Sequence, residues 1–127
     1  MLRLRWIGGF AVMFGLVAGC GSDDPAEMPT QSCTIKNIGN VSGTDACTDY
    51  VGWPSNLVLM LCSVPGSTYS SEACPTSKRI GGCRGSGSGT AHYIRWYYPR
   101  TDAAMPATAA DVMADCASTS GETYVAP

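Results

Sequence analysis

The chain has 127 residues, a formal net charge of −2 and seven cysteines. This length allows one small domain, and the acidic balance argues against a nucleic acid as partner. The cysteines are many for a chain of this size, which favours export to an oxidising compartment.

The first residues follow the order of a secretory signal. Arg3 and Arg5 form a positive start, and an apolar run follows from Trp6 to Val17. That run is shorter than the roughly 20 residues needed by a helix that spans a bilayer. We therefore interpret residues 1–19 as a signal peptide and not as a membrane anchor.

The signal ends in a pentad that resembles the lipobox of bacterial lipoproteins, Leu16-Val17-Ala18-Gly19-Cys20. The resemblance implies cleavage before Cys20, a diacylglycerol on its sulfur and acylation of the new amino group. Several acyl chains hold a protein on a membrane stably. In such lipoproteins an aspartate directly after the lipid-bearing cysteine favours retention in the inner membrane. Gly21 occupies that position here, so the resemblance favours the outer membrane. Asp23 and Asp24 follow soon after and are a weaker signal for the inner membrane. The alternative is an ordinary signal peptide with a chance cysteine.

The next segment, residues 20–32, is polar and contains two prolines, which is typical of a flexible tether. We place the globular domain at residues 33–127. Its aliphatic content is low, so other features have to stabilise it.

Six further cysteines supply that stabilisation. An even number of cysteines in a small exported domain predicts three disulfides, but six cysteines allow 15 pairings. The sequence contains no C-x2-C pair and His92 is its only histidine, so a zinc site is disfavoured and we expect no metal or cofactor. The six are Cys33, Cys47, Cys62, Cys74, Cys83 and Cys116.

The domain is predicted to be α+β, with two short helices against a small antiparallel sheet. Residues 33–43 are rich in turn formers, and residues 45–51 form a short strand. The apolar run at 57–62 favours a helix with Ser55 as a possible N-cap. Strands at 78–84 and 90–98 form a hairpin around the glycine loop 85–89.

The second helix is predicted at 109–117, where Thr108 and Asp111 resemble a capping box. Its inward side would be Ala109, Val112, Met113 and Cys116. An internal echo accompanies it, since Cys62…Gly66…Thr68-Tyr69 resembles Cys116…Gly121…Thr123-Tyr124. The echo suggests two helices of similar design, each leading into an extended segment, although chance similarity is an alternative.

The chain also resembles the small cysteine-rich lipoproteins of myxobacteria and related bacteria. That resemblance implies no particular activity. It rests on the short motifs Ala46-Cys47-Thr48-Asp49-Tyr50, Ala73-Cys74-Pro75, Gly82-Cys83, Tyr97-Tyr98 and Cys116…Gly121.

No catalytic constellation is recognisable. His92 is the only available base of its kind, and it lies among apolar and aromatic neighbours where a structural role is more common. The cysteines are expected to be oxidised and hence poor nucleophiles. We therefore expect a non-catalytic envelope protein with an interaction or structural role, and a hydrolase is the least favoured alternative.

The strand at 90–98 offers a candidate binding surface. Alternation places His92, Ile94, Trp96 and Tyr98 on one face and Tyr93, Arg95 and Tyr97 on the other. If exposed, the second face would present two tyrosines beside an arginine, with Arg84 nearby, to an anionic or sugar-containing envelope polymer. The alternative is that these tyrosines form the core. Lys78, Arg79 and Arg100 complete a basic stretch, which equally fits a hairpin covered by acidic neighbours.

Overall fold

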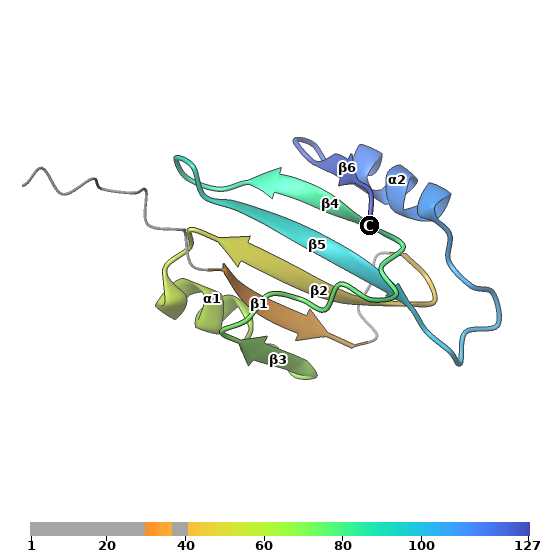
Figure 1. Ribbon diagram of the computed structural model, residues 1–127, viewed down its shortest axis with the longest axis horizontal. Coiled ribbons are helices and arrows are strands. Elements are labelled where there is room, and N and C mark those ends of the chain that lie inside the picture. Colours follow the sequence, from red (N-terminus) through yellow and green to blue (C-terminus); the bar gives the residue numbers. More distant parts are fainter. Residues whose placement is uncertain (1–29, 37–40) are drawn as a thin grey trace, which may run out of the picture.

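The computed structural model describes residues 30–36 and 41–127. They form one antiparallel sheet with strand order β3-β1-β2-β5-β4-β6 and two helices, which confirms the predicted α+β class (Figure 1). The elements in chain order are β1 (Thr30–Ile35), β2 (Thr44–Val51), α1 (Ser55–Leu61), β3 (Ser67–Ser70), β4 (Gly81–Ser86), β5 (His92–Pro99), α2 (Ala109–Ser118) and β6 (Thr123–Val125).

The sheet consists of two halves with the same topology. Each half runs strand, strand, helix, strand, and its last strand returns to pair with its first: β3 with β1, and β6 with β4. In each half a disulfide joins the first strand to the helical segment, Cys33–Cys62 in one and Cys83–Cys116 in the other. The halves meet where β2 pairs with β5.

The internal echo in the sequence corresponds to this repeat. Tyr69 lies opposite Cys33 in one half, and Tyr124 lies opposite Cys83 in the other. The expectation of two similar helices, each leading into an extended segment, is therefore confirmed. The third disulfide, Cys47–Cys74, has no counterpart in this symmetry among the described residues.

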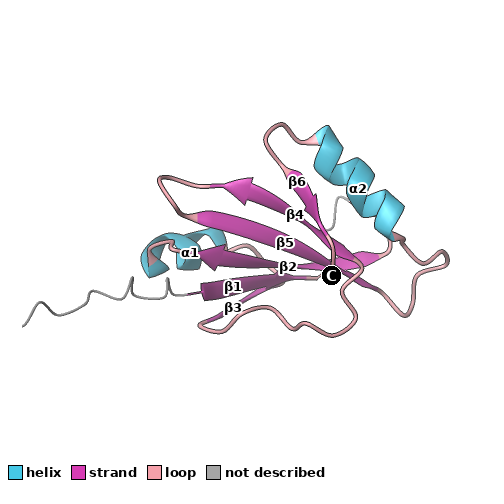
Figure 2. Ribbon diagram, turned by 45° about the horizontal axis from the view of Figure 1, so that its top comes forward, coloured by secondary structure: helices cyan, strands magenta, loops and turns pink. Residues whose placement is uncertain are grey.

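Both helices cover the same face of the sheet, here called the helix face. Directly opposite residues share a face, and one cross-strand row links the two helix disulfides. It runs Tyr69, Cys33, Thr48, Arg95, Cys83, Tyr124. Along this row α1 contacts β1, whereas α2 contacts β4 and β6, so the helices lie at opposite ends of the sheet (Figure 2).

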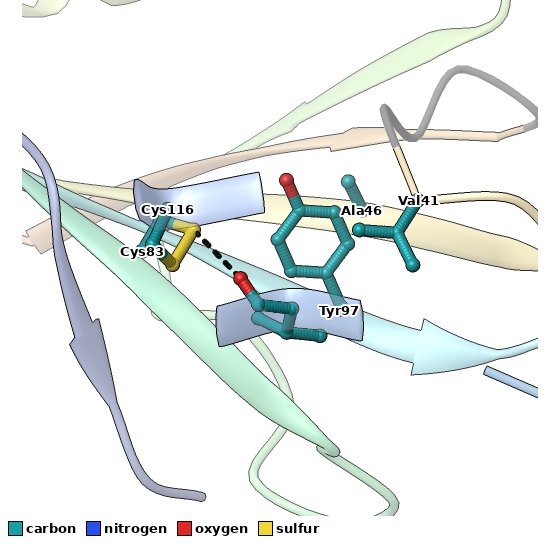
Figure 3. Close-up of a cluster of buried hydrophobic side chains, with 6 residues drawn as sticks. Val41, Ala46, Cys83, Tyr97 and Cys116 are labelled. Carbon is teal, nitrogen blue, oxygen red and sulfur yellow. Dashed lines mark hydrogen bonds between the residues drawn. A yellow bond between two sulfur atoms is a disulfide. The ribbon is translucent and has the colours of Figure 1, made fainter. Parts of the chain in front are cut away.

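The core beneath α2 is built around Tyr97. This side chain is fully buried with Val112, Ala46 and the Cys83–Cys116 disulfide (Figure 3). The capping box at the start of α2 is confirmed, because the Asp111 carboxylate accepts from the backbone N–H of Thr108 at 2.7 Å and the Thr108 hydroxyl faces the backbone N–H of Asp111. Because the domain has few aliphatic residues, an aromatic ring and a disulfide fill much of this core.

The opposite face is covered by residues 71–80, which cross the sheet from β3 to β4 and are here called the strap (Figure 1). Cys47–Cys74 fixes the strap to β2. The buried carboxylate of Asp49 accepts from the backbone N–H of Cys74 at 2.6 Å and from Trp96 Nε1 at 2.8 Å. Both faces are therefore covered in part, one by helices and one by an irregular segment.

Five local predictions are corrected. The strand predicted at 78–84 is β4, Gly81–Ser86, so Gly85 and Ser86 belong to the strand and not to the glycine loop. Thr30 to Ser32 belong to β1 and not to a tether, and the strand continues to Ile35 where turns were expected. Pro54 and not Ser55 is the N-cap of α1, and Met113 is exposed on α2 instead of facing inward. The error at β1 has a tertiary cause, since β1 is stabilised by pairing on both sides with β2 and β3.

Candidate functional site

A shallow recess of about 250 Å³ opens on the helix face, where β2 meets β5 beside α1. Because Thr48 and Arg95 face each other at this seam, the recess lies at the junction of the two halves. Its lining residues are Thr48, Tyr50, Trp53, Leu61, Tyr93 and Arg95.

Three partly exposed aromatic rings dominate the lining. Tyr50 and Tyr93 lie directly opposite each other on β2 and β5. Trp53, in the loop before α1, packs edge-on against Tyr50 with ring centroids 5.5 Å apart. Its indole Nε1 donates to the carbonyl oxygen of His92 at 2.9 Å, which fixes the ring across the strand ends. Aromatic faces held in this way are preorganised for stacking.

Glycines on β4 and in the turn after it make room for two of these rings. A Cβ added at Gly85 would lie 2.2 Å from the Tyr93 ring, and one added at Gly87 would lie 2.8 Å from Trp53. These are distances that side-chain atoms do not tolerate. The glycine-rich segment is therefore required by the aromatic lining as well as by the turn.

Arg95 is already paired with acids of the second half. Its Nη2 donates to Glu122 at 2.9 Å and to Asp115 at 3.3 Å, and its Nε donates to the Tyr97 hydroxyl at 2.7 Å. Glu122 also accepts from the Tyr93 hydroxyl at 2.8 Å. One cation is thus balanced by two carboxylates, and the recess presents no net positive charge to a ligand.

The tyrosines of this region are neutral at physiological pH. Burial, followed by the hydrogen bond to Glu122, raises the pKa of Tyr93. Burial raises the pKa of Tyr50 as well. For Tyr97, burial and then the hydrogen bond to Asp115 raise the pKa to about 12. The recess is therefore lined by neutral phenols and not by phenolate anions.

The binding surface expected from the sequence is only partly assembled. Tyr93 and Arg95 lie in the recess, but Tyr97 is buried under α2. Arg84 is exposed on the opposite face, because it pairs with Ile94 and not with Arg95. The proposed four-residue platform is therefore wrong, and so is the grouping of its arginines into one cationic patch.

Tyr50 and Trp53 are members of the site that the sequence pattern did not predict. Alternation along 45–51 does place Tyr50 on the same face as Thr48, which was a usable signal. It required knowing that this strand lies beside β5, and no local pattern states that. Trp53 lies outside regular structure, so no periodicity indicated its direction.

Other chemical candidates are weaker. The His92 ring lies with Nδ1 3.3 Å from the carbonyl oxygen of Thr90. No cluster of three or more potential metal ligands occurs among residues 30–36 and 41–127. A larger recess of about 450 Å³ beside α2 is lined mainly by small side chains, together with Met105, Asp111 and Asp115, and contains no aromatic ring.

The expected lipidation site at Cys20, the expected signal peptide and most of the expected tether lie outside the described residues. Within the described part of the chain, neither helix has the length and apolarity that crossing a bilayer requires. Comparisons with known proteins return no matching family model, no matching curated protein and no matching solved structure.

Proposed function

We propose that this protein is a lipid-anchored, non-catalytic binding protein of the bacterial cell envelope that takes a neutral saccharide into the aromatic recess. The observation that carries the ligand class is the recess itself, which is lined by three aromatic side chains and a charge-compensated arginine. A purely structural role in the envelope is the alternative.

Anchoring is supported by the sequence and by the cysteine chemistry. The lipobox-like pentad ends in Cys20, and the small cysteine-rich lipoproteins that the chain resembles share this arrangement. The six cysteines of the domain form three disulfides, which is what an oxidising extracytoplasmic compartment favours. The anchor would leave the folded domain exposed at a membrane surface.

The ligand class follows from the electrostatics of the recess. Ring faces carry partial negative charge and attract the C–H groups of a sugar ring. An anionic polymer, one of the two ligand classes that the sequence suggests, is disfavoured because Arg95 is compensated by Asp115 and Glu122. A neutral saccharide needs no free cation, and it uses both the rings and the polar groups at the rim.

Calorimetric titration of the disulfide-bonded chain from residue 20 with neutral oligosaccharides tests this proposal. Trp53→Ala should weaken binding at least about tenfold, as expected for loss of an aromatic anchor. Arg84→Ala is the matched control, because it removes an exposed side chain from the opposite face, and it should bind like the wild type. Thermal unfolding verifies that both variants are folded.

The salt dependence of the affinity distinguishes a neutral saccharide from an anionic polymer as the ligand. Screening acts on exposed charges beyond about 8 Å at physiological ionic strength, so neutral stacking should be almost insensitive to added salt. Affinity that collapses with salt, or a Trp53→Ala variant that binds as well as the wild type, contradicts the proposal. Absence of binding to any neutral saccharide would favour the structural alternative.

The anchor is tested separately. Mass spectrometry of the mature protein should find an N-terminal peptide that begins at an acylated Cys20. Cys20→Ala should release the protein from the membrane fraction. An unmodified N-terminus on protein that is not in the membrane fraction would contradict the anchor without bearing on the recess.

A further inference from the structure

The outward surface of α1 is apolar and open to solvent. Val58 and Cys62 point toward the sheet and are buried. Three exposed apolar residues of the helix and a fourth in the turn after it form what is here called the α1 patch: Leu59, Met60, Leu61 and Val64, which are 49%, 63%, 42% and 45% exposed.

An exposed apolar surface of this kind is usually covered by a partner or a membrane. Surface helices normally carry polar residues opposite their buried side, whereas α1 exposes apolar side chains there after a polar first turn at Ser55 and Asn56. The whole segment from Val51 to Ser71 contains no Asp, Glu, Lys, Arg or His. A partner surface would therefore desolvate no charge on α1.

The point where the N-terminal segment joins the domain indicates that the membrane is the apolar environment nearest to α1. β1 begins at Thr30, which pairs with Val51 just before α1, and the Gln31 side chain donates to the carbonyl oxygen of Trp53 at 3.1 Å. The segment leading back to Cys20 thus joins the domain beside α1. The ten residues from Cys20 to Thr30 span at most about 35 Å when extended.

We infer that the α1 patch inserts into the interface of the membrane that carries the lipid anchor and so orients the domain on it. This inference rests on the anchoring proposed above. A patch this small binds a bilayer weakly by itself, but a short tether makes its binding intramolecular, at an effective concentration in the millimolar range. The occupant of the patch is therefore lipid.

Methionine oxidation by hydrogen peroxide tests the inference with internal controls. Met60 lies in the α1 patch, while Met105 and Met113 lie beside or on α2 and are 80% and 48% exposed. The chain from residue 20, carrying Cys20→Ala and an N-terminal hexahistidine tag, is held on phosphatidylethanolamine–phosphatidylglycerol vesicles through a nickel-chelating lipid. This arm does not depend on natural lipidation, so its failure is separable from failure of the anchor.

On vesicles the oxidation rate of Met60 should fall at least about threefold relative to the same protein in solution, because the thioether leaves water. The rates of Met105 and Met113 should stay the same. Leu59→Ser with Leu61→Ser should restore rapid oxidation of Met60, and both positions are exposed enough for the fold to tolerate the change.

Three results would overturn the inference. Met60 could be oxidised equally fast in solution and on vesicles. Met60, Met105 and Met113 could be protected to the same extent, which would mean non-specific adsorption. Protection could occur only in native membrane fractions and not on pure lipid, which would make the partner a protein.

Discussion

Replacing Asp49 by Asn isolates the contribution of the carboxylate that holds the strap to the sheet. The carboxylate is buried, and its two oxygens accept from different donors, the backbone N–H of Cys74 and Trp96 Nε1. Arg79 adds positive charge 3.8 Å away and stacks over the Trp96 ring at 3.9 Å from its centroid. Asn preserves the shape but has only one acceptor oxygen.

The expected cost follows from these contacts. One charge-assisted hydrogen bond is lost, worth about 1.5–3 kcal/mol, and one buried N–H is left facing an amide donor, at about 1–3 kcal/mol. Arg79 still donates to the carbonyl oxygens of Cys74 and Pro75, so the loss of its ion pair with Asp49 costs little additional free energy. We expect Asp49→Asn to lower the free energy of unfolding by roughly 3 kcal/mol, or the melting temperature by roughly 15 °C.

Thermal unfolding followed by circular dichroism, with disulfides intact, measures this effect. The matched control is Asp102→Asn, because Asp102 is exposed and pairs with Arg100 at the surface. The control should leave the melting temperature within about 2 °C of the wild type. A loss below about 1 kcal/mol for Asp49→Asn would mean that the disulfide alone holds the strap.

Three further changes test other parts of the structure. The pKa of Tyr97 is raised to about 12 in the folded protein. Its neutral form therefore stabilises the fold fully below pH 10, and this contribution, up to about 3 kcal/mol, is lost as the pH rises through 12. Tyr97→Phe should flatten that part of the alkaline unfolding profile, and an unchanged profile contradicts the assignment. Replacing Cys83 and Cys116 together by Ser should cost about 4 kcal/mol in denaturant unfolding; a cost near zero would contradict the framework. Gly85→Ala should cost about 1–3 kcal/mol by displacing Tyr93, and the same change in a Tyr93→Ala background should cost clearly less; equal costs would refute the contact.

Several features could be predicted because their causes are local. The capping box of α2 needs only Thr108 and Asp111 three residues apart, and it forms as expected. The strand at 90–98 was identified from its alternation and β-branched and aromatic content, and it corresponds to β5. The even number of cysteines predicted three disulfides without their partners.

The binding site could be predicted only in part, because its geometry depends on contacts between distant residues. Alternation separated Tyr93, Arg95 and Tyr97 from Trp96, but it did not state that α2 covers Tyr97 while the space beside Tyr93 stays open. Arg95 meets Glu122 only because β6 returns to pair with β4. That pairing changes the charge of the recess and with it the expected ligand.

The sequence by itself therefore determined the local periodicities, the capping box of α2, the number of cysteines and the repeat that begins at Cys62 and Cys116. The tertiary structure alone decided the disulfide pairing, the inclusion of Thr30 to Ser32 in β1 and the choice of which face each helix covers. The physical reason is that a period-2 pattern divides side chains into two sets but leaves the two sets equivalent. Only packing decides which members of each set are buried: α2 covers Tyr97 and the strap covers Trp96, whereas Tyr93, in the same set as Tyr97, lines the open recess.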